Sequence, residues 1–273
     1  MTVAGKALGA VLVAACVAGL SGCATGSNDA AAGSTTLPAE TEQAAARLAG
    51  RYAHFDVVAY QDPLMKTLII SYGFTDLTDE DGTLVAKESF CSSEHRSDQP
   101  IQVTLSDTAT QAIKPVPTPV TLTVENGRAR ISRPETPTGI GVTLADPAHD
   151  PLPTDPKDPR VTDDDGDGKP GVTSTIKVTD TFGGEIYIAR REIFAYVVDE
   201  QADGSLTGTV SDHSEQLVLG ASNDAFLTQA QWTQYADRSK SPIILIPVDA
   251  DWDCGRLMAE RARLFPPTPV VDW

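Results

Sequence analysis

Apolar residues recur at every second position over most of the chain, and this period constrains the fold more than any other feature. Phe55, Val57 and Ala59 show it first, against the polar neighbours His54 and Asp56. Later segments repeat it at 68–75, 84–90, 101–105, 121–131, 172–178, 185–198, 206–210 and 216–219. Successive strand side chains point to opposite faces, so the pattern predicts strands, about eleven in all. Turns and short helices join them, which favours an all-β antiparallel barrel, calycin-like or otherwise, or a sandwich.

The clearest turn lies at Asn126-Gly127, between two alternating segments. Both residues suit the positive φ angles of a type I′ turn. A two-residue hairpin at this point pairs Glu125 with Arg128. It also places four apolar side chains on one face, namely Leu122, Val124, Ala129 and Ile131.

Short helices are expected near the N-terminus and at the C-terminus of the β-rich domain. The first covers Ala39–Leu48, and the second begins at Asp253 and ends before Pro266-Pro267. One stripe of the second helix carries the apolar residues Cys254, Leu257, Met258, Leu264 and Phe265. The segment Ile243–Ile246 is apolar on both faces, which predicts a central strand.

Residues 146–170 contain eight Asp and six Pro, and no aromatic residue. Such a composition rules out a strand or a helix interior and predicts a long exposed loop. The strands on both sides of it are similar in kind, so we expect one β-rich domain over residues 39–273 rather than two domains.

The N-terminal segment has the pattern of an export signal. Lys6 precedes the apolar run 7–20, which ends at Leu20-Ser21-Gly22-Cys23. These four residues resemble the lipobox of bacterial lipoproteins. The resemblance covers residues 1–23 only. It implies that residues 1–22 are a signal peptide and that Cys23 carries acyl chains such as palmitate, which anchor the chain to a membrane.

Residues 23–38, rich in Ala, Ser, Thr and Gly, are then a flexible tether. Two alternatives stay open: a poorer lipobox at residues 13–16, which leaves a short apolar run, and an ordinary secreted protein cut nearby. Ala24, rather than an aspartate, follows Cys23. By resemblance to lipoproteins of Gram-negative bacteria, this favours the outer membrane over the inner membrane of the cell envelope.

Removal of Cys16 with the signal peptide and acylation of Cys23 leave Cys91 and Cys254. Two cysteines in an exported chain predict one disulfide between them. The alternative is two separate buried thiols.

The formal net charge of −17 limits the partners. A surface this acidic repels phosphate, so nucleic acid and anionic lipid headgroups are poor partners and cations are better ones.

The segment Asp163-Asp164-Asp165-Gly166-Asp167-Gly168 is a candidate calcium loop. It resembles the loops of EF-hands, dockerins and thrombospondin type 3 repeats, which implies that Asp163, Asp165 and Asp167 are ligands. It departs from that pattern at Pro170 and at Ser174, where an acidic residue is expected. Further ligands would come from elsewhere, for example Asp155, Asp158 or Asp180. The alternative is a solvated acidic linker.

No constellation of the sequence predicts an enzyme. The segment Asp212-His213-Ser214-Glu215 contains the residue types of a hydrolase triad, but neighbours on a strand face opposite ways. Seven aromatic residues either line a barrel interior or form ordinary core: Tyr52, Phe55, Tyr72, Phe74, Tyr187, Phe194 and Tyr196.

Three functions remain. We expect a non-enzymatic envelope lipoprotein whose barrel binds an apolar small molecule or lipid. The first alternative is a structural or adhesive lipoprotein with a calcium-ordered acidic loop. The second is a hydrolase whose site is assembled from separated loops.

Overall fold

The computed structural model describes residues 39–273 except residue 230, and the described residues form one compact unit. The predicted signal peptide, the lipobox with Cys23 and the tether lie outside the described residues. None of the helices described between residues 39 and 273 is both long and apolar enough to cross a membrane.

The all-β prediction is confirmed, with thirteen strands in place of about eleven, and every pairing between them is antiparallel. The strands are β1 (Gly50–Gln61), β2 (Lys66–Glu80), β3 (Thr83–Ser97), β4 (Gln102–Leu105), β5 (Thr118–Pro119), β6 (Thr121–Glu125), β7 (Arg128–Ile140), β8 (Val172–Lys177), β9 (Gly183–Glu200), β10 (Leu206–Asp212), β11 (Glu215–Ala221), β12 (Thr233–Gln234) and β13 (Pro242–Val248). The helices are α1 (Ala39–Leu48), α2 (Asp107–Gln111) and α3 (Cys254–Leu264), with two 3₁₀ turns, η1 (Asp224–Phe226) and η2 (Arg238–Lys240).

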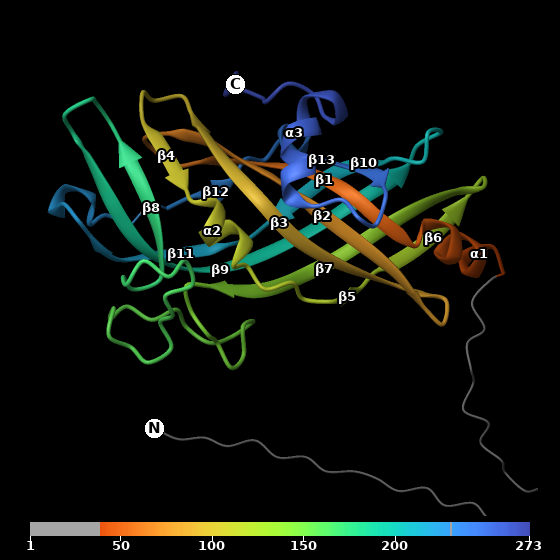
Figure 1. Cartoon of the computed structure of the whole chain (residues 1–273), viewed down its shortest axis with the longest axis horizontal. Coiled ribbons are helices and arrows are strands. Elements are labelled where there is room, and N and C mark those ends of the chain that lie inside the picture. Colours follow the sequence, from red (N-terminus) through yellow and green to blue (C-terminus); the bar gives the residue numbers. More distant parts are fainter. Residues whose placement is uncertain (1–38, 230) are drawn as a thin grey trace, which may run out of the picture. The chain divides into compact units, whose positions relative to one another are not determined.

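The strands form a single sheet that curls into a half-barrel (Figure 1). Its main path runs β4-β8-β9-β10-β13-β1-β2-β3-β5. Strand β9 pairs with β8 and then β7 on one side, and with β11 and then β10 on the other. This long strand therefore holds both ends of the half-barrel together.

Strand β1 is buried on both faces, and its two faces meet different cores. Ala53, Phe55 and Val57 contact an outer core beneath α3, together with Trp252 and Leu257. The alternate residues face the inside of the half-barrel. The predicted central strand β13 lies beside β1 and shares this property, since Ile243 and Leu245 face inward and Ile244 and Ile246 face outward.

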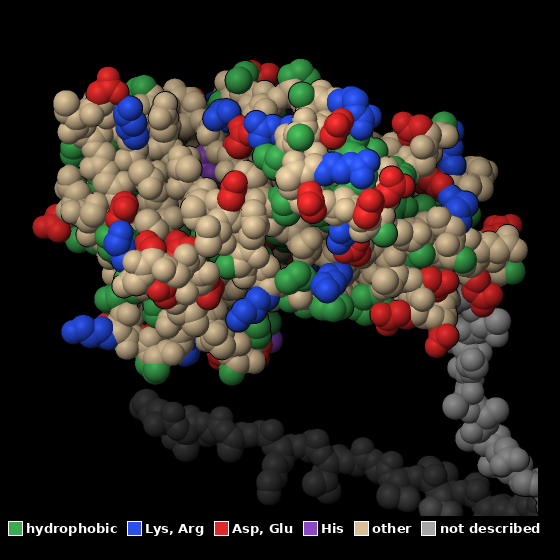
Figure 2. Space-filling view, viewed as in Figure 1, with side chains coloured by type: hydrophobic (Ala, Val, Ile, Leu, Met, Phe, Trp, Pro, Cys, Tyr) green, Lys and Arg blue, Asp and Glu red, His purple; other side chains and the backbone are tan. Residues whose placement is uncertain are grey.

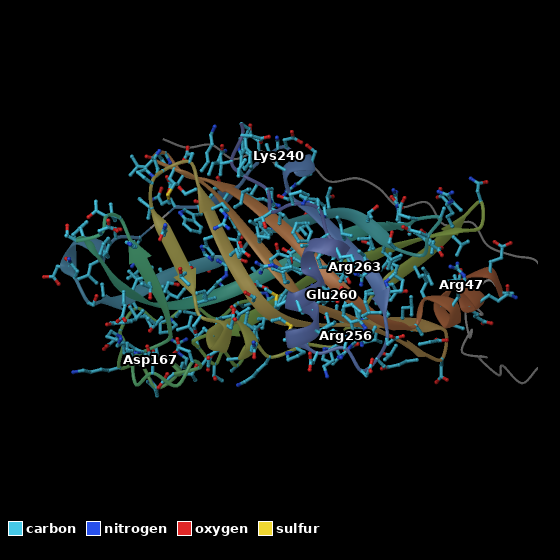
Figure 3. The ribbon with its side chains drawn as sticks, turned by 45° about the horizontal axis from the view of Figure 1, so that its top comes forward. Arg47, Asp167, Lys240, Arg256, Glu260 and Arg263 are labelled. Carbon is cyan, nitrogen blue, oxygen red and sulfur yellow. A yellow bond between two sulfur atoms is a disulfide. The ribbon has the colours of Figure 1, made fainter. Side chains whose placement is uncertain are left out.

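The predicted disulfide between Cys91 and Cys254 is confirmed, with 5.3 Å between the two Cα atoms. It fixes the first turn of α3 to β3. The helix begins as expected at Asp253, whose side chain accepts a hydrogen bond from the Arg256 backbone N–H. Figure 3 shows Arg256, Glu260 and Arg263 along α3, and Figure 2 shows acidic and basic side chains interspersed over this face.

The Asn126-Gly127 hairpin also forms as expected. Glu125 pairs with Arg128, and the two turn residues have φ angles of 53° and 76°. Its apolar face covers the inside of the half-barrel near α1, where Ala129 and Ile131 are buried with Ala45 and Leu48. This end of the interior is filled with side chains.

The acidic segment 146–170 contains no named strand or helix, as predicted, but it is not wholly exposed. Leu144, just before it, and Leu152 within it pack against Ala189 and Leu219 on the outer face of the sheet. Gly171 ends the segment with a φ of 86°, so close to β9 that a Cβ there would lie 2.2 Å from the Ile188 carbonyl oxygen. The apolar contacts and this close approach hold the segment against β9.

Candidate functional site

The end of the half-barrel away from α1 is hollow. A cavity of about 740 Å³ lies there, between β1, β2 and β3 on one side and β4, β8 and β9 on the other. Its wall is mainly aliphatic and aromatic, including Val58, Ile69, Phe90, Ile101, Val103, Leu105, Ile113, Ile140, Val172, Ile176, Ile186, Ile188, Val218 and Trp232.

The wall follows directly from the alternation of the strands. On β9 the even-numbered residues from Ile186 to Phe194 line the cavity, and on β8 Val172, Ser174 and Ile176 do so. The intervening residues of β9 face outward. Arg191, for example, donates to the backbone carbonyls of Pro147 and Asp150. The alternation of inward and outward side chains thus gives the cavity an apolar wall. Two of the inward residues of β9 are charged, however: Arg190 and Glu192.

Among the described residues that line the cavity, four carry carboxyl groups and one carries a guanidinium. The carboxyl groups belong to Asp56, Asp62, Glu192 and Asp212, and the guanidinium belongs to Arg190. They come from four parts of the chain: β1, the β1–β2 loop, β9 and β10. Apart from Asp62 at the β1–β2 loop, they form one buried polar cluster in the wall, which we call the carboxylate cluster (Asp56, Arg190, Glu192 and Asp212).

Hydrogen bonds fix most of this cluster. The Tyr60 hydroxyl donates to Asp212 Oδ1 at 2.6 Å and accepts from Arg190 at 3.3 Å. Ser214 donates to the other oxygen of Asp212 at 2.7 Å. Asp56 Oδ1 lies 2.9 Å from His54 Nε2, whose other ring nitrogen lies 2.8 Å from Thr75 Oγ1. Burial raises the pKa of Asp56, and the contact with His54 opposes that rise.

Glu192 differs from the other two carboxyl groups because no hydrogen bond to its side chain is found among the described residues. Its nearest charged partner is Arg190, with 3.7 Å between Oε2 and Nε. One fifth of its side chain (21%) remains accessible, and the residue lines the cavity. Burial raises the pKa of Glu192 to about 7; Arg190 opposes the shift, and the charges of Asp212 and Asp56 add to it.

His95, on β3, also lines the cavity. Its Nδ1 atom is buried without a hydrogen-bond partner. Burial, with the nearby positive charge of Arg190, lowers the pKa of His95 to about 4. The imidazole is therefore neutral at physiological pH and offers an unsatisfied ring nitrogen.

A second buried ion pair supports the wall behind Phe194. Arg133 Nε lies 3.0 Å from Glu88 Oε1, and the Tyr196 hydroxyl donates to the same oxygen at 3.1 Å. The Arg133 guanidinium lies 5.4 Å from the centre of the Phe194 ring. Because each charge has a partner, this pair separates the filled part of the interior from the cavity without leaving a free charge.

The aromatic residues named from the sequence are mostly ordinary core, and only Phe194 of the seven lines the cavity. Tyr52 and Tyr196 lie in the filled interior, Phe55, Tyr72 and Phe74 lie in the outer core, and the Tyr187 ring lies 5.1 Å from Lys169 Nζ. The segment 212–215 forms no relay, as expected, because the His213 side chain contacts Glu135 instead of Asp212 or Ser214.

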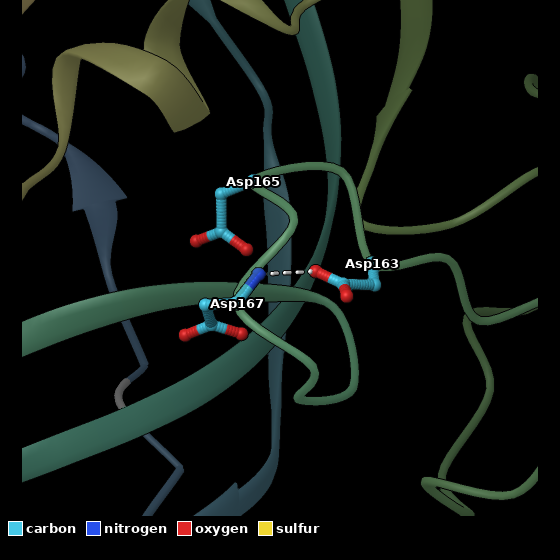
Figure 4. A group of neighbouring side chains, drawn as sticks. All are labelled: Asp163, Asp165 and Asp167. Carbon is cyan, nitrogen blue, oxygen red and sulfur yellow. Dashed lines mark hydrogen bonds between the residues drawn. The ribbon is translucent and has the colours of Figure 1, made fainter.

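The three carboxylates of the candidate calcium loop do converge, and their ligand atoms all lie within 4.8 Å of one another (Figure 4). Both oxygens of Asp163 accept from backbone N–H groups, those of Asp167 and Gly168. Asp165 Oδ2 accepts from the Thr173 backbone, whereas Asp165 Oδ1 is buried without a partner. Burial raises the pKa of Asp165, and Asp167 and Asp163 add to the rise.

The additional ligands suggested from the sequence are engaged elsewhere. Asp158 binds the Arg160 guanidinium with both oxygens, which lowers the pKa of Asp158 to about 2. Asp180 forms an ion pair with Lys177, and Asp155 accepts from the Lys157 backbone. The loop could therefore hold a hard cation through three carboxylates, with water completing the shell.

The sequence interpretation missed the carboxylate cluster entirely. One signal was present: Arg190 and Glu192 stand at inward positions of an otherwise apolar alternation. Asp56 and Asp212 carried no such signal, since only the strand register brings them together.

No family model matches the sequence, and no curated protein or solved structure matches the chain.

The raised pKa of Glu192 predicts a specific pH dependence of stability. Its ordinary value is 4.5, so between about pH 4.5 and 7 the folded chain holds a proton that the unfolded chain releases. The free energy of unfolding therefore falls as the pH rises through this range, by up to about 3 kcal/mol from this group. Glu192→Gln should leave the free energy of unfolding almost unchanged at about pH 4 and raise it at about pH 8.

Urea unfolding of the unaltered chain and of Glu192→Gln at the two pH values measures this difference. The neighbouring charged and titratable groups are the same in both proteins, so their contributions cancel: Asp56, Asp212, His95, Arg190 and Arg133. Asp199→Asn, on the same strand but in an exposed ion pair with Arg130, is the matched control. Equal differences at both pH values would contradict the raised pKa.

Proposed function

We propose that this protein is a non-enzymatic, lipid-anchored module of the cell envelope that binds an apolar small molecule or lipid. The single observation that carries the proposal is the cavity of about 740 Å³. Pockets that hold small organic molecules have volumes of roughly 300–1,000 Å³ and mainly apolar walls with a few polar groups. The cavity meets each of these conditions.

The rim of the cavity supports the same function. Leu64, in the loop between β1 and β2, lines the cavity and is 85% exposed. Phe226 also lines it and stacks on Phe182, which is 42% exposed, with 5.3 Å between ring centres. Exposed apolar side chains beside a hollow suit the entry of an apolar molecule better than that of a polar one.

Strand β4 allows a matched test of the cavity. Val103 points into it, whereas Thr104, the next residue, is exposed on the other face. Val103→Trp should fill part of the cavity and weaken binding of the neutral apolar fluorophore N-phenyl-1-naphthylamine at least about tenfold, because one side chain then occupies the ligand's volume. Thr104→Trp should change the affinity less than about twofold. Equal affinities of both variants, or no binding by the unaltered chain, would overturn the proposal.

Anchoring through Cys23 is the second part of the proposal, and its support is the lipobox-like segment 20–23. Two or three acyl chains hold a protein stably at a membrane, whereas one does not. The acyl chains on Cys23 would place the domain at the envelope, with the outer membrane favoured over the inner.

Replacing the thiol tests the anchor. Cys23→Ser should move the protein from the membrane fraction to the soluble fraction, and the intact mass should lack the acyl groups. A Cys16→Ser variant serves as the control and should stay in the membrane fraction. An unaltered protein that is soluble and unmodified would contradict the anchor.

A second candidate function is a structural or adhesive envelope lipoprotein whose acidic loop is ordered by calcium. It is supported by the convergence of Asp163, Asp165 and Asp167 and by the buried, unpartnered oxygen of Asp165. A cation would offset the repulsion by which Asp163 and Asp167 raise the pKa of Asp165.

Calcium should then raise the melting temperature, with a stabilisation that grows as RT ln(1 + [Ca²⁺]/Kd). Magnesium should do less, because it demands near-octahedral ligands at short distance. Asp165→Ala should remove most of the calcium effect, whereas Asp180→Ala, in an exposed pair, should not. If sodium at equal ionic strength raises the melting temperature as much as calcium does, the segment is an acidic linker and not a calcium site.

A further inference from the structure

The charges in the cavity wall specify the polar end of the ligand. We infer that the molecule bound in the cavity is an apolar amine, whose ammonium group pairs with Glu192. This inference rests on the proposed function, since it names the class of ligand for the same cavity.

The balance of charges is the first argument. The charge of Asp212 raises the pKa values of both Asp56 and Glu192, and Arg190 carries the only guanidinium or ammonium group among the described residues of the wall. At about pH 8, above the pKa of Glu192, the carboxylates of the described wall therefore outnumber its one guanidinium. Charges interact more strongly in a water-poor cavity than in solution, so a cation is attracted and an anion repelled. The formal net charge of −17 adds to this preference.

Arg190 is the one group that could favour an anionic ligand such as a fatty acid. Its guanidinium is already partly engaged, because it donates to Tyr60 and lies 3.7 Å from Glu192, and the charge of Asp212 stabilises its protonated form. An added carboxylate would share this one guanidinium with Glu192 and Asp212. The geometry therefore disfavours an anionic head.

Hydrogen bonding is the second, independent argument. Glu192 has no hydrogen bond to another described residue, and His95 Nδ1 is buried without a partner. The charge of Arg190 acts to lower the pKa of both side chains, and both residues line the cavity. An ammonium group brings three N–H donors to the Glu192 carboxyl group, which is accessible from the cavity, whereas a carboxylate brings none. The unsatisfied groups of the wall are thus complementary to a donor-rich cation.

Three ligands with the same ten-carbon chain separate the head from the tail: decylamine, 1-decanol and decanoate. Each is titrated against the full chain loaded with N-phenyl-1-naphthylamine at about pH 8, where the amine is charged. Decylamine should displace the fluorophore at a concentration at least about tenfold lower than 1-decanol, and decanoate should be the weakest of the three. Ethylamine, which has the head without the tail, should not displace it.

Two variants of β9 assign the effect to one residue. Glu192→Gln should weaken decylamine about tenfold while 1-decanol changes less than about twofold. Asp199→Asn removes the same charge from the exposed side of the strand and should change neither. Thermal melting of both variants checks that they are folded.

The outcomes distinguish the inference from the proposed function. Decanoate binding as tightly as decylamine, or equal losses in Glu192→Gln and Asp199→Asn, would overturn the amine assignment while the cavity remains a binding site. Failure of all three ten-carbon ligands to displace the fluorophore, together with its own failure to bind, would overturn both.

Discussion

The structure depends above all on the pairing of β9 (Gly183–Glu200) with four other strands. Its ladder with β7 and β10 at one end and with β8 and β11 at the other forces the sheet to curl. The same strand contributes Tyr196 and Val198 to the filled interior and Ile186 to Phe194 to the cavity. The filled interior and the cavity are therefore two ends of one inner face of β9. A shift in the register of this strand would change the side chains that face both of them.

The outer face of the curled sheet must also be covered. Helix α3 covers the outer face of β1 and β2, and the Cys91–Cys254 disulfide ties its first turn to β3. Because the outer core already buries half of the side chains of these strands, the inner face can tolerate both a hollow and buried charges. A carboxyl group without a hydrogen bond in an apolar wall lowers stability, and this cost supports the proposal that Glu192 serves binding.

The sequence predicted the features that local chemistry determines. The turn at Asn126-Gly127, the start of α3 at Asp253 and the two-faced strand β13 all depend on neighbouring residues. The disulfide followed from the number of cysteines. The cavity could not be predicted, because alternation assigns side chains to a face but does not say whether that face is filled. The carboxylate cluster was missed because register alone brings Asp56, Arg190 and Asp212 together. The acidic segment was expected to be exposed, and its anchor Leu152 is a single apolar residue among prolines.

The central claim is that the inside of the half-barrel is hollow between β1, β2 and β3 on one side and β4, β8 and β9 on the other. Diffraction from a crystal of the protein under xenon pressure tests it directly, because xenon enters apolar cavities and scatters strongly. The account predicts xenon beside the inward side chains of Val103, Val172 and Ile188. Side chains that fill this space, with no xenon between these strands, would contradict it.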